Sequence, residues 1–266
     1  MTAGVDKIIH ALNGDGIVTT GFSGNDQLFA GDGMQGLYGN AGNDFLVAGS
    51  GNQLLYGGSG DDYLVAGYGN QTLDGGSGND IVDFSKLAGK LVIDQDLYTA
   101  TLLDPLTGAV LYTYTVKSFN GLVGTDYGTD VHGQANTANL YVFGAGNDRY
   151  YSESGGDTIS GGGGIDTYSW MKKYVAVGHV DTVTDFQVGT DKLDMSDFLK
   201  GQGFKAPTYD QVVRIADVVD SNGAHNAMIQ TLGGGVWHDT VILSGINIFD
   251  VGVDHHTLKL ADLGVI

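Results

Sequence analysis

The sequence predicts an all-β protein built as a parallel β-roll, a right-handed β-solenoid of nine-residue units in two blocks with a β-rich C-terminal cap. Glycine accounts for 45 of the 266 residues. Acidic residues number 31 against 12 basic ones, and Glu153 is the only glutamate. Because aspartate is a poorer helix former than glutamate, this choice of acid indicates loops rather than helices. The third observation is a glycine-rich unit that recurs every nine residues.

The composition excludes several classes of protein. Only Pro105 and Pro207 are proline, which rules out collagen, and the 42% hydrophobic content disfavours disorder. The net charge of −19 would repel nucleic acid and anionic membranes, so cations are the expected partners. No apolar run approaches the roughly 18 residues of a membrane span, so no membrane insertion is expected. Residues 1–12 do not resemble a signal peptide.

The first block of repeats runs without a gap from Gly21 to Asp83. Its seven units are GFSGNDQLF, AGDGMQGLY, GNAGNDFLV, AGSGNQLLY, GGSGDDYLV, AGYGNQTLD and GGSGNDIVD. The eighth position is always aliphatic: Leu28, Leu37, Leu46, Leu55, Leu64, Leu73 and Val82. The glycine-rich half of each unit permits a tight turn, and a short strand follows that buries one side chain. Two units make one coil, and coils must stack because one coil cannot bury this column alone.

This unit resembles the RTX (repeats-in-toxin) nonapeptide, GGxGxD followed by any residue, an aliphatic residue and any residue. The resemblance implies a calcium-binding β-roll. In that family, the turn carbonyls and the sixth-position aspartate of one turn hold Ca²⁺ jointly with the next turn on the same side. The chemistry suits Ca²⁺, which takes about six to eight oxygen ligands in a flexible geometry, better than it suits Mg²⁺.

The sixth position alternates along the first block: Asp26, Gln35, Asp44, Gln53, Asp62, Gln71 and Asp80. With two units per coil, the aspartates fall on one edge of the roll and the glutamines on the other. We expect three ions, between Asp26 and Asp44, between Asp44 and Asp62, and between Asp62 and Asp80. Neutral amides bind Ca²⁺ weakly but can hydrogen-bond along a stack. The hypothesis is therefore a one-sided calcium roll.

A second block follows in a new register over residues 125–169. Its sixth positions are Asp130, Asn139, Asp148, Asp157 and Asp166. Same-side neighbours predict two further ions along Asp130, Asp148 and Asp166, whereas Asn139 with Asp157 is the weaker pair. The expected metal ligands are Asp26, Asp44, Asp62, Asp80, Asp130, Asp148, Asp157 and Asp166. They would hold about five Ca²⁺ ions in all.

Two further segments flank or interrupt the blocks. Residues 1–20 are expected to form an N-terminal cap, in which Val5, Ile8, Ile9 and Leu12 line one face of a short helix; an irregular strand is the alternative. Residues 84–124 interrupt the repeats. They indicate strands at Leu91–Asp94, Tyr98–Leu103 and Val110–Val116, with a hairpin turn over residues 104–108.

The nonapeptides stop at residue 170, and residues 170–266 are expected to form a C-terminal cap and secretion-signal region. The segments 181–186 (DTVTDF) and 189–196 (GTDKLDMS) resemble the cap that follows the roll in serralysin-type and other type I secreted proteins. Residues 239–245 (DTVILSG) resemble its closing strand, and the chain ends in DLGVI. This resemblance implies an uncleaved C-terminal signal, type I secretion machinery as a partner, and a secreted or cell-surface location.

The expected function is that of a calcium-binding extracellular RTX module that folds on Ca²⁺ binding after type I secretion. The chain is not expected to be an enzyme. It has no G-x-S-x-G or HExxH motif, and His255 with His256 lacks a third ligand at a useful spacing. The alternative is a structural or polysaccharide-binding module, such as a surface layer, an adhesin or an alginate-epimerase R-module. In that case tyrosines such as Tyr38 and Tyr56 would stack on sugar rings, or the chain would self-associate.

Overall fold

The structure, a computed structural model, describes residues 6–135, 137–170, 179–196, 213–233 and 236–246. It divides into two compact units. The first comprises Met1–Val131 with Val142–Gly144, and the second comprises His132–Tyr141 with Ala145–Ile266. All of the regular elements in the described residues are strands, which confirms the all-β prediction.

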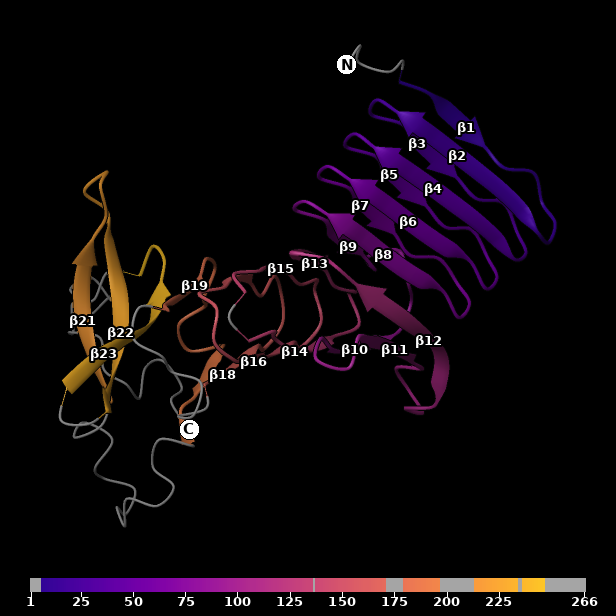
Figure 1. Cartoon of the computed structure of the whole chain (residues 1–266). Helices are drawn as coiled ribbons and strands as arrows, with labels where there is room; N and C mark the ends of the chain where they lie inside the picture. The colour runs from indigo at the N-terminus through magenta and orange to yellow at the C-terminus, as the bar shows by residue number, and fades with distance from the viewer. Residues whose placement is uncertain (1–5, 136, 171–178, 197–212, 234–235, 247–266) are drawn as a thin grey trace. The chain divides into compact units, whose positions relative to one another are not determined.

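The first unit contains two sheets whose strands alternate along the chain (Figure 1). The β3 sheet consists of β1 (Ile8–His10), β3 (Gln27–Phe29), β5 (Phe45–Val47), β7 (Tyr63–Val65), β9 (Ile81–Asp83) and β13 (Gly121–Val123). The β4 sheet begins with β2 (Ile17–Ser23), β4 (Gln35–Ala41), β6 (Leu54–Ser59) and β8 (Thr72–Ser77). These strands pair in parallel, each with the strand one coil further along.

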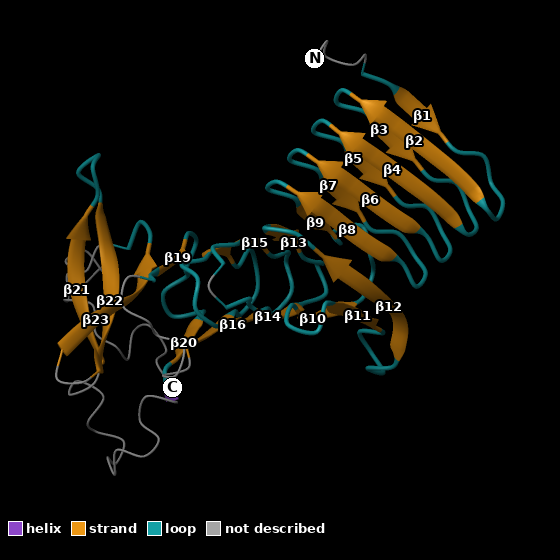
Figure 2. Ribbon diagram, in the orientation of Figure 1, coloured by secondary structure: helices purple, strands orange, loops and turns teal. Residues whose placement is uncertain are grey.

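The eighth-position residues form the core of this unit. Leu28, Leu46, Leu64 and Val82 align in the β3 sheet, and Leu37, Leu55 and Leu73 align in the β4 sheet. All seven are fully buried. The strands are short and alternate with turns (Figure 2). The nine-residue period therefore builds the stacked roll that the sequence predicts.

The interruption between the repeat blocks is an insertion into the β4 sheet. It contains β10 (Lys90–Asp94), β11 (Thr99–Leu103) and β12 (Val110–Lys117), each paired antiparallel with the next. Asp104 N–H donates to the Ala109 carbonyl at 2.8 Å and closes the hairpin turn. β14 (Thr129–His132) then lies beside β10.

The end of the interruption belongs to the roll itself. β12 pairs in parallel with β8, so that Val116 lies beside Leu73. β13 pairs in parallel with β9, so that Leu122 lies beside Val82. Both Val116 and Leu122 are buried. One more coil therefore stacks on the first block before the second block begins.

The prediction of a short N-terminal helix is wrong. Residues Ile8–His10 form strand β1, which pairs in parallel with β3 and places Ile9 beside Leu28. A helix this short is only marginally stable, whereas a strand at the edge of the sheet can hydrogen-bond its backbone to β3. The roll thus begins one coil earlier than Gly21.

The second unit contains short strands that pair in parallel, as in the first unit, and three longer strands, β21 to β23, that pair antiparallel. One sheet contains β15 (Leu140–Val142), β17 (Thr158–Ser160), β19 (Asp181–Val183), β23 (Val236–Leu243), β22 (His225–Gly233) and β21 (Val213–Val219). The other contains β16 (Arg149–Ser152), β18 (Thr167–Trp170) and β20 (Lys192–Asp194). The segment that resembles the closing strand, residues 239–245, overlaps the end of β23, which pairs in parallel with β19 and antiparallel with β22.

The chain end DLGVI and the pair His255–His256 lie outside the described residues. Among the residues that the structure does describe, no helix is both long and apolar enough to cross a membrane.

Candidate functional site

Four carboxylates form a column along one edge of the first unit. We call this column, made of Asp26, Asp44, Asp62 and Asp80, the Asp edge. The backbone N–H of each of the first three aspartates donates to Oδ1 of the aspartate in the next coil, at 2.7 Å from Asp26 to Asp44 and at 2.8 Å from Asp62 to Asp80. The sequence therefore brings these four predicted ligands together in the expected order.

The second oxygen of each of these carboxylates has no such partner. All four Oδ2 atoms are buried without a hydrogen bond, and none of the four residues is more than 2% exposed. A buried polar atom without a partner costs about 1–3 kcal/mol, and more when the group is charged. Each Oδ2 therefore needs a donor or a cation.

Each Oδ2 also faces a glycine at the first position of its own turn. A Cβ on Gly39 would overlap Asp44 Oδ2 and lie 2.6 Å from the carbonyl oxygen of Gly57 in the next coil. Gly57 has the same relation to Asp62 Oδ2 and the Gly75 carbonyl. The glycines thus keep open a space lined by one carboxylate oxygen and one carbonyl oxygen, which we call a cradle. Hard cations such as Ca²⁺ prefer these ligand types.

Without a cation, the ionised forms of the carboxylates on the Asp edge are destabilised. Burial raises the pKa of Asp62 to about 7, and the neighbouring charges of Asp44 and Asp80 add to the rise. Burial likewise raises the pKa values of Asp44 and Asp80. Desolvation and repulsion between like charges both disfavour the ionised form. Each of these carboxylates therefore gains from a positive charge in its cradle.

Two side chains mark the ends of the Asp edge. At the N-terminal end, Lys7 N–H donates to Asp26 Oδ1 at 2.7 Å, and the Lys7 ammonium donates to the Gly21 carbonyl at 2.5 Å. Lys7 therefore takes the place of an aspartate one coil before Asp26 and brings its own positive charge. At the other end, Asn120 Oδ1 accepts from Asp80 N–H at 3.4 Å. The column is thus bounded by a cation and by a neutral amide.

The opposite edge, formed by Gln35, Gln53 and Gln71 and called the Gln edge, has no unpartnered oxygen of this kind. Gln53 Oε1 accepts from Gly49 N–H at 2.9 Å. Its Nε2 lies 2.6 Å from the Gly31 carbonyl oxygen and 3.2 Å from the Gly33 carbonyl oxygen of the preceding coil. The amide nitrogen therefore donates to turn carbonyls that would otherwise be available to a cation.

Gln35 and Gln71 repeat this arrangement. The glutamines thus bond to the backbone of the neighbouring coil rather than to one another as an amide ladder. The Gln edge ends at Tyr114, whose phenol donates to the Gly67 carbonyl at 3.0 Å. Protein donors therefore occupy the turns of Gln35, Gln53 and Gln71, as the hypothesis of a one-sided calcium roll requires.

In the second unit, the carboxylate of Asp166 resembles those of the Asp edge. Its Oδ1 accepts from Asp148 N–H at 2.9 Å, while its buried Oδ2 has no hydrogen-bond partner. The phenol oxygen of Tyr168 is also buried without a partner, and a Cβ on Gly161 would overlap both atoms. Burial raises the pKa of Asp166 to about 7. Two unsatisfied oxygens therefore face one cradle.

Asp157, also predicted as a ligand, has a different environment. Its Oδ1 accepts from Asn139 N–H at 2.8 Å, and its Oδ2 accepts from the Tyr150 phenol. Asp181 follows in the same column, where its Oδ2 accepts from Ser152 Oγ at 2.6 Å and from Trp170 Nε1 at 2.7 Å. Protein donors therefore occupy both oxygens of both carboxylates, so Asp157 lacks the open oxygen of the Asp edge.

The two remaining predicted ligands differ from each other. Asp130 belongs to the first unit, and its Oδ2 pairs with Lys90 Nζ at 2.8 Å, so a lysine supplies positive charge there as Lys7 does beside Asp26. Asp148 belongs to the second unit and is 1% exposed. Sequence reasoning missed the roles of Lys7 and Lys90, since neither lies at a sixth position of the repeats that the sequence displays.

Sequence reasoning also missed that two cap residues extend the carboxylate columns. Asp181 Oδ1 accepts from Asp157 N–H at 2.8 Å, and Asp191 Oδ1 accepts from Asp166 N–H at 3.1 Å. In each case an apolar residue, Val183 or Leu193, follows two positions later and is buried. This aspartate-to-apolar spacing matches the sixth and eighth positions of the nonapeptide and is the signal that could have found them.

No group of three or more histidine, cysteine, aspartate or glutamate side chains capable of holding a metal gathers within the described ranges. The cradles instead combine a single carboxylate oxygen with backbone carbonyls. Such a donor set fits Ca²⁺, which accepts carbonyl oxygens readily, better than Zn²⁺, which favours histidine and cysteine. The residues present therefore fit calcium.

Comparison with known proteins agrees with this chemistry. The family model of the RTX calcium-binding nonapeptide repeat matches the chain in four copies, over residues 20–33, 37–52, 56–85 and 144–168. None of the curated protein sequences compared with the chain matches it. The matched segments carry Asp26, Asp44, Asp62, Asp80, Asp148, Asp157 and Asp166. The chain therefore carries RTX calcium-binding nonapeptide repeats, and these repeats fold as a β-roll.

Proposed function

We propose that the chain is an extracellular module that folds when Ca²⁺ binds along its Asp edge after type I secretion. The observation that carries this proposal is the column of four buried Oδ2 atoms without partners, each beside a glycine cradle. A bound Ca²⁺ would supply the positive charge that these carboxylates lack. The absence of nucleophile and zinc motifs from the sequence supports a binding and folding role rather than catalysis.

The export step rests on the same carboxylates and on the C-terminal region. Where calcium is scarce, as inside a cell, burying Asp44, Asp62 and Asp80 as anions opposes folding, which suits passage of a loose chain through a narrow channel. Outside, calcium would favour the stacked state. The resemblance of residues 181–196 to the cap of type I secreted proteins supports this route and an extracellular location.

Two adjacent aspartates provide a matched test of the calcium sites. Asp62→Asn should raise the calcium concentration needed for folding roughly tenfold or more, because the variant loses the charged oxygen in its cradle. Asp61→Asn removes the same charge from the same turn and should change this midpoint less than twofold, because exposed charges are screened by water and salt. The measurement is a calcium titration of both variants and the wild type, followed by circular dichroism.

The control is conservative because asparagine already stands at the equivalent place in neighbouring coils. Asp61 Oδ1 accepts from Asn79 N–H at 2.8 Å, and Asn43 Oδ1 accepts from Asp61 N–H at 3.0 Å in the same column. Equal shifts for the two variants would mean that overall charge, not the cradle, sets calcium affinity, and would contradict the proposal.

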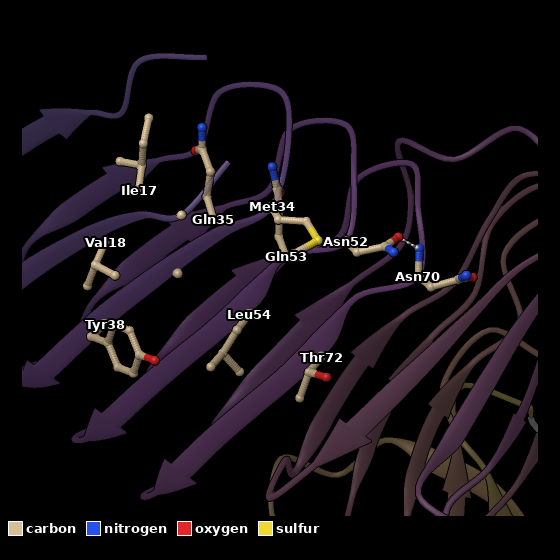
Figure 3. Close-up of a pocket in the computed structure, with 12 residues that line it drawn as sticks. Ile17, Val18, Met34, Gln35, Tyr38, Asn52, Gln53, Leu54, Asn70 and Thr72 are labelled. Carbon is tan, nitrogen blue, oxygen red and sulfur yellow. Dashed lines mark hydrogen bonds between the residues drawn. The ribbon is translucent and has the colours of Figure 1, made fainter. Parts of the chain in front are cut away.

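A second candidate function, polysaccharide binding, is favoured by a groove on the outer face of the β4 sheet. Its volume is about 460 Å³, and its lining side chains include Val18, Tyr38, Leu54 and Thr72 from four successive strands (Figure 3). None of the lining residues is charged. Asn52 and Asn70 border the groove, with Asn70 N–H bonded to Asn52 Oδ1 at 3.0 Å. One tyrosine ring with flanking amides suits a neutral sugar chain.

This candidate predicts that the calcium-folded chain binds neutral glycans on an array and that Tyr38→Ala weakens the binding at least tenfold. Tyr98→Ala is the control, since Tyr98 is 49% exposed and lies outside the groove. The loss is expected because stacking on an aromatic ring contributes on the order of 1 kcal/mol beyond its buried area. An array without any bound glycan would contradict the candidate and leave the calcium proposal standing.

A further inference from the structure

The turn that ends the interruption takes the same position as a repeat turn, although it lies outside the matched repeats. Lys117 lies opposite Asp74 in the pairing of β12 with β8, so Ser118 occupies the place that Gly75 holds one coil earlier. Asn120 N–H and Gly121 N–H donate to the Asp80 carbonyl at 2.8 and 2.9 Å. Residues 118–121 therefore close the last coil of the Asp edge.

The cradle at this turn has the same two donors as those inside the repeats. A Cβ on Gly75 would overlap the Ser118 carbonyl oxygen and Asp80 Oδ2, just as a Cβ on Gly57 would approach the Gly75 carbonyl and Asp62 Oδ2. Asp80 is 1% exposed, and its Oδ2 is buried without a partner. Ser118 has a φ of 51°, a left-handed conformation that is unusual for serine.

Pairing each Oδ2 with the carbonyl of the following coil changes the expected number of sites. Asp26, Asp44 and Asp62 pair with carbonyls of Gly39, Gly57 and Gly75. Asp80 pairs with that of Ser118. Counting only the spaces between consecutive aspartates gives three sites, whereas counting open oxygens with their facing carbonyls gives four.

We propose that a fourth calcium ion binds between Asp80 Oδ2 and the Ser118 carbonyl, and that it fastens the inserted strands β10–β12 to the repeat roll. This inference rests on the proposed function, because it extends the same calcium edge by one site. Only Phe119 separates Ser118 from Asn120, so this turn offers fewer backbone carbonyls than a nonapeptide turn. The ion keeps more of its water and binds last in a titration.

The experiment adds or removes one carboxylate at this turn in the full chain. Asn120→Asp supplies a second carboxylate to the fourth site and should lower the calcium concentration of the last binding event about tenfold, because ligand charge tunes calcium affinity. Asp80→Asn should abolish that event. The readout is the number of bound ions by native mass spectrometry in calcium, together with calcium-dependent hydrogen exchange of the Asn120 and Gly121 amides.

Asn79→Asp is the matched control for Asn120→Asp, since it adds the same charge to the adjacent turn at a place where Asp61 stands one coil earlier. It should leave the last event unchanged. If Asn120→Asp leaves the last event where it is in the wild type, or if Asn79→Asp shifts it equally, the fourth site is wrong while the other ions still bind. If the wild type binds no calcium at all, the proposed function itself fails.

Discussion

In the presence of a calcium chelator, the chain should lose most of its strand content, and any remaining fold should melt at a much lower temperature. A ligand that binds only the folded state contributes about 2.7 kcal/mol per site at a hundredfold excess over its dissociation constant. The free energy of unfolding of a typical protein domain is roughly 5–15 kcal/mol in total. Losing three or four such contributions along the Asp edge would therefore remove most of the stability.

The measurement is far-ultraviolet circular dichroism with a thermal melt, in chelator and in millimolar calcium. Millimolar magnesium is the control and should restore little structure, because Mg²⁺ demands a stricter octahedron and gives up its water reluctantly. The Gln edge needs no cation, since protein donors already occupy its turns. Identical spectra in chelator and in calcium would show that folding and calcium binding are not coupled.

Lowering the pH from about 7.5 to 5 should have opposite effects on the calcium-free and calcium-loaded chains. Burial raises the pKa values of Asp62, Asp157 and Asp166 to about 7 in the folded state, from a reference value of 3.8. The fold therefore binds protons that the unfolded chain releases between about pH 4 and 7. The resulting stability is present below pH 4 and is lost as the pH rises through 7.

The effect is large because all three carboxylates bind protons more tightly in the folded state than in the unfolded chain. The calcium-free chain should regain strand content as the pH falls towards 5, because protons neutralise the buried carboxylates. With calcium present, protons compete with the ion for the same oxygens, so acid should raise the calcium midpoint. Urea unfolding across this pH range, with and without calcium, measures both slopes. Slopes of the same sign would contradict the account.

The regular part of the fold follows from the sequence because a single period controls it. An aliphatic residue at every eighth position can be buried only if the coils stack in register, and Leu28 to Val82 are buried in this way. The alternation of aspartate and glutamine at the sixth position likewise assigns the two side chains to opposite edges. Both inferences depend on local repetition, which needs no knowledge of distant contacts.

The ends and the second block depend on tertiary contacts and could not be predicted in this way. Residues Ile8–His10 adopt a strand only because β3 offers an edge to pair with. In the first nonapeptide of the second block, residues 125–133, the buried residue is Val131 rather than the eighth-position His132. The phenol of Tyr150, a residue of strand β16, donates to Asp157 Oδ2, so this oxygen is not open. A carboxylate's position in a repeat therefore does not reveal which donor reaches it.

The most direct test of a one-sided calcium roll is anomalous X-ray diffraction from crystals grown in calcium. The account predicts anomalous peaks beside the Oδ2 atoms of Asp26, Asp44 and Asp62. It predicts none in the turns of Gln35, Gln53 and Gln71, whose amide nitrogens already donate to the turn carbonyls. Ions in the glutamine turns, or an Asp edge without ions in saturating calcium, would contradict it.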